Sequence, residues 1–216
     1  MSDPRPVSNV SLILWPTLLT VAVNVLRLVL EVQGSHTTAT GGAGAPLGIS
    51  WFVFPVGAYV GWRLRRAGSA PRLRLAWLWS LLAMAALIGA VAAGFSGIDR
   101  ADTSDAAYLS LRDTVTMIIL AALALAAFAH VLWTRLATAL LFYGVLARLT
   151  VVGMTWLAKD RGWDTHYTKF GPAGIEVDMG ETLYAATAAQ LGFWVSFTVV
   201  AGGLAGCVAA AVTRPR

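Results

Sequence analysis

The stretch VSLILWPTLLTVAVNVLRLVLEV, residues Val10–Val32, determines the fold class of this chain. It is apolar almost throughout and exceeds the roughly 20 helical residues that cross a 30 Å hydrocarbon core. Its apolar run is longer than that of a cleaved signal peptide and contains Arg27 and Glu31. We therefore expect it to remain in the protein as a transmembrane helix.

Five further apolar stretches are candidate membrane spans, so the sequence predicts an all-α, six-transmembrane-helix bundle in a single integral membrane domain, residues 1–216. The second span is short and contains Pro55, whereas the last is long enough to tilt in the bilayer. The five stretches are Leu47–Leu64, Leu73–Phe95, Thr114–Leu132, Leu136–Ala158 and Thr182–Val212.

The composition excludes several classes of protein. The 216 residues are 57% hydrophobic and 12% charged, against about 25% charged in soluble domains, which excludes a soluble globular enzyme. The single cysteine, Cys207, excludes an intrachain disulfide, a tetracysteine zinc site and a dithiol redox pair. The net charge of +5 comes from scattered arginines rather than a basic domain with interleaved aromatics, so we expect no nucleic-acid partner.

The basic residues also predict the orientation, because short loops rich in Lys and Arg stay on the cytoplasmic side. The most basic loop is WRLRRAGSAPRLR, residues 62–74, between the second and third spans. This places both termini in the cytoplasm and the protein in the cell inner (plasma) membrane as a multi-pass protein. We expect the arginines of this loop to contact anionic lipid head groups. They are Arg63, Arg65, Arg66, Arg72 and Arg74.

The first and last helical hairpins resemble each other weakly. VLRLVL from Val25 resembles LARLTV from Leu146, and each stretch places one arginine in the outward part of its helix. The returning helices each carry two glycines four residues apart, a spacing that lets helices approach closely in membranes. These features suggest a parallel repeat, and the glycines could pack helices within the chain, in a homo-oligomer or against another protein. The glycines are Gly57, Gly61, Gly202 and Gly206.

Two arginines inside predicted spans, Arg27 and Arg148, are the costliest residues to insert, at roughly 2.5–3.5 kcal/mol each at a helix centre. One interpretation is structural: Arg27 pairs with Glu31, and Arg148 pairs with Asp113 or helix carbonyls. The other is a polar cavity open to the outside, in which the guanidinium groups bind a carboxylate or phosphate. Polar residues at comparable depth that could line it are Asn24, Tyr143, Tyr184 and Gln190.

The predicted outer (periplasmic-side) loop, residues 159–182, is longer than most connections in helical bundles, so we expect an ordered cap loop. Asp164 and His166 lie two apart and share a face in extended backbone, where they could act in acid–base catalysis or ligate a metal. Trp163 and Tyr167 supply aromatic contacts, and an ordinary interfacial cap would explain the same residues. The acidic and histidine residues have no metal-ligand spacing, so we predict neither a metal nor a cofactor. They are His36, Asp164, His166, Glu176, Asp178 and Glu181.

Three functions are compatible with these features. The first is binding or transport of a small anionic molecule or lipid head group, with Arg27 and Arg148 as its contacts. The second is a membrane-embedded enzyme that uses His166 and Asp164. The third is an accessory subunit that docks a larger complex through its glycine faces. ATP-driven transport by this chain alone is excluded, because the sequence has no phosphate-binding glycine loop.

Overall fold

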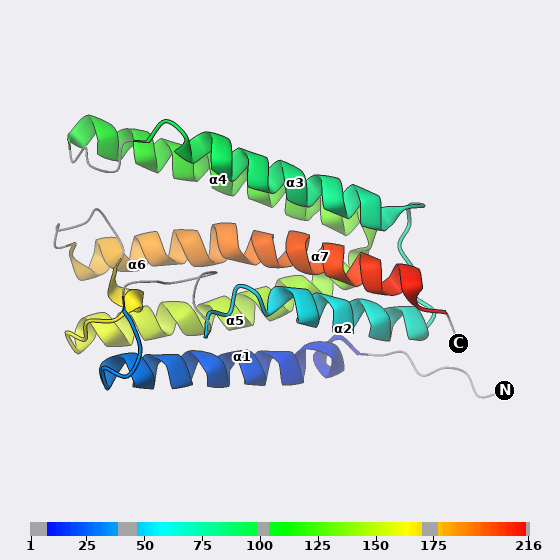
Figure 1. Cartoon of the computed structure of the whole chain (residues 1–216), viewed down its shortest axis with the longest axis horizontal. Coiled ribbons are helices and arrows are strands. Elements are labelled where there is room, and N and C mark those ends of the chain that lie inside the picture. Colours follow the sequence, from blue (N-terminus) through cyan, green and yellow to red (C-terminus); the bar gives the residue numbers. More distant parts are fainter. Residues whose placement is uncertain (1–7, 39–46, 99–103, 170–176, 215–216) are drawn as a thin grey trace.

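The computed structural model describes residues 8–38, 47–98, 104–169 and 177–214, and all regular elements in these ranges are helices (Figure 1). The all-α prediction is confirmed. The elements are α1 (Asn9–Val32), α2 (Val53–Arg66), α3 (Ala76–Phe95), α4 (Asp105–Leu132), α5 (Thr134–Asp160), the 3-10 turn η2 (His166–Thr168), α6 (Met179–Thr187), the π-helical segment η3 (Ala188–Trp194) and α7 (Val195–Val212).

Five helical segments are long and apolar enough to cross a membrane, so the chain is a membrane-embedded helical bundle. Four of these segments are α1, α3, α4 and α5, and the fifth is the continuous helix formed by α6, η3 and α7. Hydropathy alone predicted each of them. Their boundaries differ where a capping residue intervenes: α4 begins at Asp105 rather than Thr114, because the Ser104 side chain accepts a hydrogen bond from Ala107 N at 3.2 Å.

The second predicted span is wrong over its first part. Residues 47–52 form turns, and α2 has only 14 residues, about 21 Å of helix against about 30 Å of hydrocarbon. Pro55 lies in the first turn of α2, where a backbone N–H would have no partner within the helix. Proline is therefore compatible with this helix start, and the non-helical backbone before it lies partway along the length of the bundle (Figure 1).

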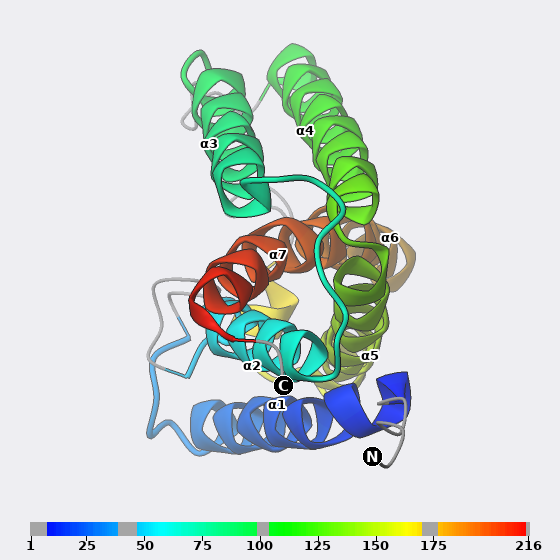
Figure 2. The same ribbon diagram turned by 90° about the vertical axis from the view of Figure 1, so that its right-hand side faces the viewer.

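The helices form two unequal groups around α7. Figure 2 shows the α3–α4 hairpin extending to one side of α7, with α1, α2 and α5 on the other. Ala83, Leu87 and Ala122 of the hairpin pack on Val200 of α7. The larger group buries a core contributed by α1, α2, α5 and α7. That core includes Leu12, Val60, Leu136, Leu140 and Val199.

The two glycine pairs pack against each other within this chain. Gly57 of α2 faces Gly202 of α7, and Gly61 faces Gly206, so closely that a Cβ atom on either α2 glycine would overlap the opposing backbone. The close approach that we expected at these glycines therefore occurs between α2 and α7, and this surface is not open to an oligomer or another protein.

Both ends of the described chain lie at the same end of the bundle, where α1 begins and α7 ends (Figure 1). The segment after α5 folds back over the opposite end. Tyr167 in this segment is buried against Leu28 of α1 and Met154 of α5. Lys159 Nζ donates a hydrogen bond to Val177 O at 2.7 Å, which ties the two ends of the segment together.

Candidate functional site

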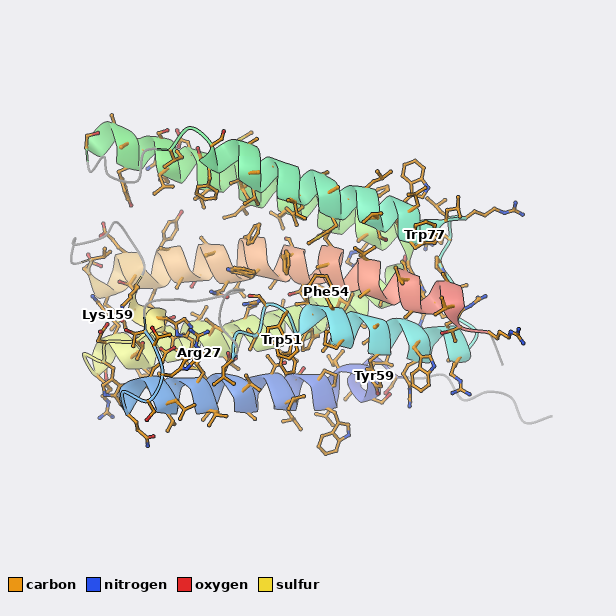
Figure 3. The ribbon with its side chains drawn as sticks, in the orientation of Figure 1. Arg27, Trp51, Phe54, Tyr59, Trp77 and Lys159 are labelled. Carbon is orange, nitrogen blue, oxygen red and sulfur yellow. The ribbon has the colours of Figure 1, made fainter. Side chains whose placement is uncertain are left out.

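A cavity of about 230 Å³ lies within the half of the bundle away from the termini, where Figure 3 labels the lining residue Arg27. It is enclosed by α1, the turns before α2, α5, η2 and η3. In Figure 3 Arg27 lies between α1 and the helices above it, toward the same end of the bundle as Lys159. Six residues predicted to form a site line the cavity together. They are Asn24, Arg27, Arg148, His166, Tyr167 and Gln190.

Glu31 organises one wall of the cavity. Its carboxylate, with a side chain 0% exposed, accepts a hydrogen bond from Arg27 Nε at 2.8 Å. It also accepts hydrogen bonds from His166 Nδ1 at 2.7 Å and from the His166 backbone N–H at 3.0 Å. This network joins the middle of the loop after α5 to α1, at residues 135 positions apart in sequence.

The predicted pairing of His166 with Asp164 is wrong. Asp164 has a side chain 79% exposed, and its carboxylate lies 3.3 Å from Lys169 Nζ. The pairing requires extended backbone, in which residues two apart share a face. Thr165 between them is extended, but the Asp164 carboxylate lies at the surface beside Lys169, whereas the His166 imidazole contacts the buried Glu31 carboxylate.

The ionisation of the loop residues follows from their burial. Burial lowers the pKa of His166, an effect opposed by the hydrogen bond to Glu31 and reinforced by the charge of Arg27. His166 is therefore neutral at pH 7 and donates its Nδ1–H to Glu31, which leaves Nε2 as an acceptor. Burial also raises the pKa of Tyr167, whose hydroxyl donates to Asn24 O at 3.3 Å.

Arg148 occupies the middle of α5 and is only 4% exposed. Its Nη1 donates a long hydrogen bond of 3.4 Å to Gln190 Oε1, and its guanidinium lies over the Trp194 ring at 4.8 Å from the centroid. No carboxylate lies within salt-bridge distance of it in the part of the chain that the structure describes. The proposed partner Asp113 pairs instead with Arg112 at the surface, at 3.7 Å.

The π-helical segment explains how Gln190 and Trp194 reach Arg148. Both residues lie in η3, where one wider turn rotates the helix relative to the α-helical register. π-helical turns are rare and are frequently found at functional sites. Hydropathy contains no signal for such a turn, so the sequence alone favours an interfacial aromatic belt as the role of Trp194.

Besides Glu31 and Asp164, three predicted residues do not line this cavity. Tyr143 is buried deeper in the bundle, where its hydroxyl is 2.9 Å from Thr20 Oγ1. Tyr184 is 76% exposed on the surface of α6. Trp163 lines a separate, more open cavity of about 620 Å³. That second cavity is also lined by Glu31, His36 and Asp164.

The turns before α2 supply residues that sequence reasoning missed. Gly48, Ile49 and Ser50 line the cavity, as does Val151 of α5. Ser50 is 2% exposed, and its hydroxyl has no hydrogen-bond partner among the described residues. Non-helical backbone in a membrane protein is tolerated where it is buried or lines a polar space, as here. The sequence feature that could have indicated these turns is the polar Ser50 between Gly48 and Pro55 in an otherwise apolar stretch.

The acidic and histidine residues of the loops do not form a metal site in the ranges that the structure covers. Glu176, one of the residues considered for such a site, lies outside the described residues. His36 lies near His166 but belongs to the second cavity.

The lowered pKa of His166 predicts the pH dependence of stability. Between the pKa of about 6.5 of an unfolded histidine and the lower folded value, the unfolded chain binds more protons, so stability increases with pH. The contribution of His166 is complete above pH 6.5 and is lost as the pH falls toward the folded pKa. Thermal unfolding of wild type and His166→Gln from pH 8 to pH 5 should show the wild type losing stability relative to the variant. A difference that is constant with pH, or that grows in favour of the wild type in acid, would contradict this.

The cavity thus combines a buried cation, neutral hydrogen-bond donors and an aromatic surface, and these groups are suited to binding an anion away from bulk water. The chain matches no protein-family model, and no curated protein or solved structure is significantly similar to it.

Proposed function

We propose that this protein binds or transports a small anionic molecule or lipid head group through the cavity that contains Arg148. The observation that carries the proposal is the burial of Arg148 without a carboxylate in the described part of the chain. Buried charges in proteins are ordinarily paired, because desolvation of an isolated ion costs several kcal/mol. A bound anion would supply the missing charge.

The surroundings of Arg148 support an anion as ligand. A planar guanidinium can donate two parallel hydrogen bonds to a carboxylate or phosphate. The unpartnered Ser50 hydroxyl lines the same cavity and can donate another. Trp194 packs on the guanidinium and restricts its orientation. In this proposal Arg148 and Gln190, both predicted to line the site, contact the anion directly. The charge of Arg27 is instead offset by Glu31.

In this proposal the protein lies in the inner (plasma) membrane with both termini in the cytoplasm, and the cavity opens outward. The positive-inside rule supports this orientation, because the arginine-rich segment 62–74 lies at the same end of the bundle as the termini. Of the predicted cap loop, residues 159–182, the described part up to residue 169 then covers the outer mouth, and residues 170–176 lie outside the described residues. The arginines of segment 62–74 contact anionic lipids.

Reporter fusions test the orientation. A reporter that is active only in the cytoplasm should be active when placed between Gly68 and Pro71 or after Arg216, because both sites follow basic segments. A reporter that is active only outside the cytoplasm should be active when inserted after Gly162. External activity at either of the first two positions would overturn the proposed topology.

Substitution of Arg148 tests the binding function. In lipid nanodiscs at constant ionic strength, acetate, phosphate and sulfate are each titrated while thermal unfolding is measured, since a ligand at 100 times its Kd stabilises a protein by about 2.7 kcal/mol. We expect at least one anion to stabilise the wild type. Arg148→Gln should weaken the binding of that anion by about 10- to 100-fold, the loss expected for charge-assisted hydrogen bonds worth about 1.5–3 kcal/mol.

The matched control is Arg112→Gln, since Arg112 has a side chain 60% exposed on α4, outside the cavity. It should respond to the anions as the wild type does. Absence of stabilisation by all three anions, or equal responses in the two variants, would contradict an anion site at Arg148.

The hydrogen bond between Glu31 and His166 favours a second candidate function, a membrane-embedded enzyme. A carboxylate that accepts the Nδ1–H of a neutral histidine leaves Nε2 able to take a proton, which is the arrangement of many general bases. Glu31 thus replaces Asp164 in the catalytic alternative. Recovery of the bound anion after incubation separates the two functions: it returns unchanged from a binding protein, and is converted by the wild type but not by His166→Gln in an enzyme.

A further inference from the structure

The charges around the cavity determine how much negative charge a ligand can bring. Among the described residues, the cationic groups that line it are Arg27 and Arg148, and the carboxylate that contacts its wall is Glu31. His166 is neutral at pH 7, and Asp164 is directed to Lys169 at the surface. The described residues therefore leave one positive unit of charge at the cavity, located at Arg148.

A ligand with one negative charge balances this cavity, whereas a dianion would leave an excess negative charge in a desolvated space. Buried uncompensated charge is strongly unfavourable, so the net charge of the cavity discriminates between the two. The position of Glu31 strengthens the discrimination, because its carboxylate would repel a second anionic group placed near Arg27.

The rest of the lining fits an organic body attached to the anionic group. Ile49, Val151 and Trp194 supply apolar surface, while Ser50 and Gln190 lie among the polar residues. The cavity of about 230 Å³ is smaller than the roughly 300–1,000 Å³ of sites for drug-sized ligands. Apolar walls beside a single guanidinium are suited to a carboxylate with a short hydrocarbon portion.

We infer that the ligand of this cavity is a monocarboxylate whose carboxylate binds the guanidinium of Arg148 and whose hydrocarbon portion packs against Trp194 and Val151. This inference rests on the proposed anion-binding function and narrows it to one class of ligand. The carboxylate is the same chemistry whether it belongs to a free short-chain acid or to a fatty acid from the membrane.

The test compares propionate with malonate, which has one more carboxylate in a similar volume, by titration calorimetry at pH 8 into the full-length protein in nanodiscs. Both carboxyl groups of malonate are ionised there, since carboxyl pKa values lie near 4. We expect propionate to bind at least tenfold more tightly than malonate, and inorganic phosphate to bind more weakly than propionate. Dodecanoate is titrated in parallel. Binding of propionate supports a free short-chain acid as the ligand, and binding of dodecanoate supports a fatty acid from the membrane.

A charge-changing variant provides an independent readout. Glu31→Gln raises the net charge of the cavity by one unit, so the ratio of malonate to propionate affinity should rise at least tenfold relative to wild type. Asp164→Asn removes an exposed carboxylate nearby and should leave the ratio unchanged. If Glu31→Gln does not fold, the comparison of propionate with malonate binding to the wild type still tests the inference.

The outcomes separate the two proposals. Binding of malonate or phosphate as tightly as propionate, abolished by Arg148→Gln, would overturn the monocarboxylate inference and leave the anion site intact. Failure of the wild type to bind any of these acids or phosphate would overturn the anion-binding function itself.

Discussion

Glu31→Ala is expected to lower the free energy of unfolding by about 3–5 kcal/mol, the usual cost of removing one partner of a buried ion pair. The carboxylate is 0% exposed and accepts hydrogen bonds from both Arg27 and His166. Its removal leaves the charge of Arg27 without the carboxylate that offsets it and removes the hydrogen bonds of His166 to α1, while Tyr167 still contacts α1. Thermal and denaturant unfolding in detergent measure the loss.

Asp164→Ala is the matched control, because sequence spacing alone favours Asp164 as the partner of His166. Its side chain is 79% exposed, so the change should be within about 0.5 kcal/mol. A second comparison uses Arg27→Met combined with Glu31→Ala, which should recover part of the loss because neither charge of the buried pair remains. A Glu31→Ala variant as stable as Asp164→Ala would contradict the buried network.

Gly61→Ala is expected to destabilise the bundle by about 3 kcal/mol or more. The added Cβ would overlap the backbone of Gly206, and backbone cannot move aside as the end of a flexible side chain can. Overpacking of ordinary cores costs about 1–3 kcal/mol, and separation of α2 from α7 would also disturb contacts along both helices. Gly57→Ala should behave similarly, since it meets Gly202 in the same way.

Gly153→Ala in α5 is the control for helix propensity. No atom lies within 4 Å of a Cβ added there, so the variant should be neutral or gain up to about 1 kcal/mol from the lower backbone entropy of alanine in the unfolded chain. Equal effects of the substitutions at Gly61 and Gly153 on thermal unfolding would contradict the close packing of α2 on α7.

Much of the fold could be predicted because the hydrophobic effect acts on contiguous segments. Long apolar stretches specify spanning helices whatever their neighbours are, and the insertion cost of Arg27 and Arg148 is by itself enough to predict the burial that both residues show. The same reasoning overextended the second span. Hydropathy reports that Leu47–Leu64 is apolar, but it does not distinguish a helix from the turns that line the cavity at residues 48–50.

The site was harder to predict because its contacts join distant parts of the chain. Local spacing favoured Asp164 as the partner of His166, whereas the structure pairs His166 with the buried Glu31, 135 positions away, and leaves Asp164 at the surface. Trp194 could not be assigned to the site, since its position depends on the π-helical register of η3. Tyr184 shares the predicted depth of Gln190 but lies on the exposed face of α6, which depth alone does not specify.

The most direct test of an anion site at Arg148 is the anomalous diffraction of crystals soaked in iodide, an unreactive monoanion. The proposed site predicts an anomalous peak inside the cavity, in contact with the Arg148 guanidinium and close to Trp194, that is lost in Arg148→Gln crystals. Iodide peaks confined to exposed arginines such as Arg112, or a carboxylate side chain found on Arg148, would contradict it.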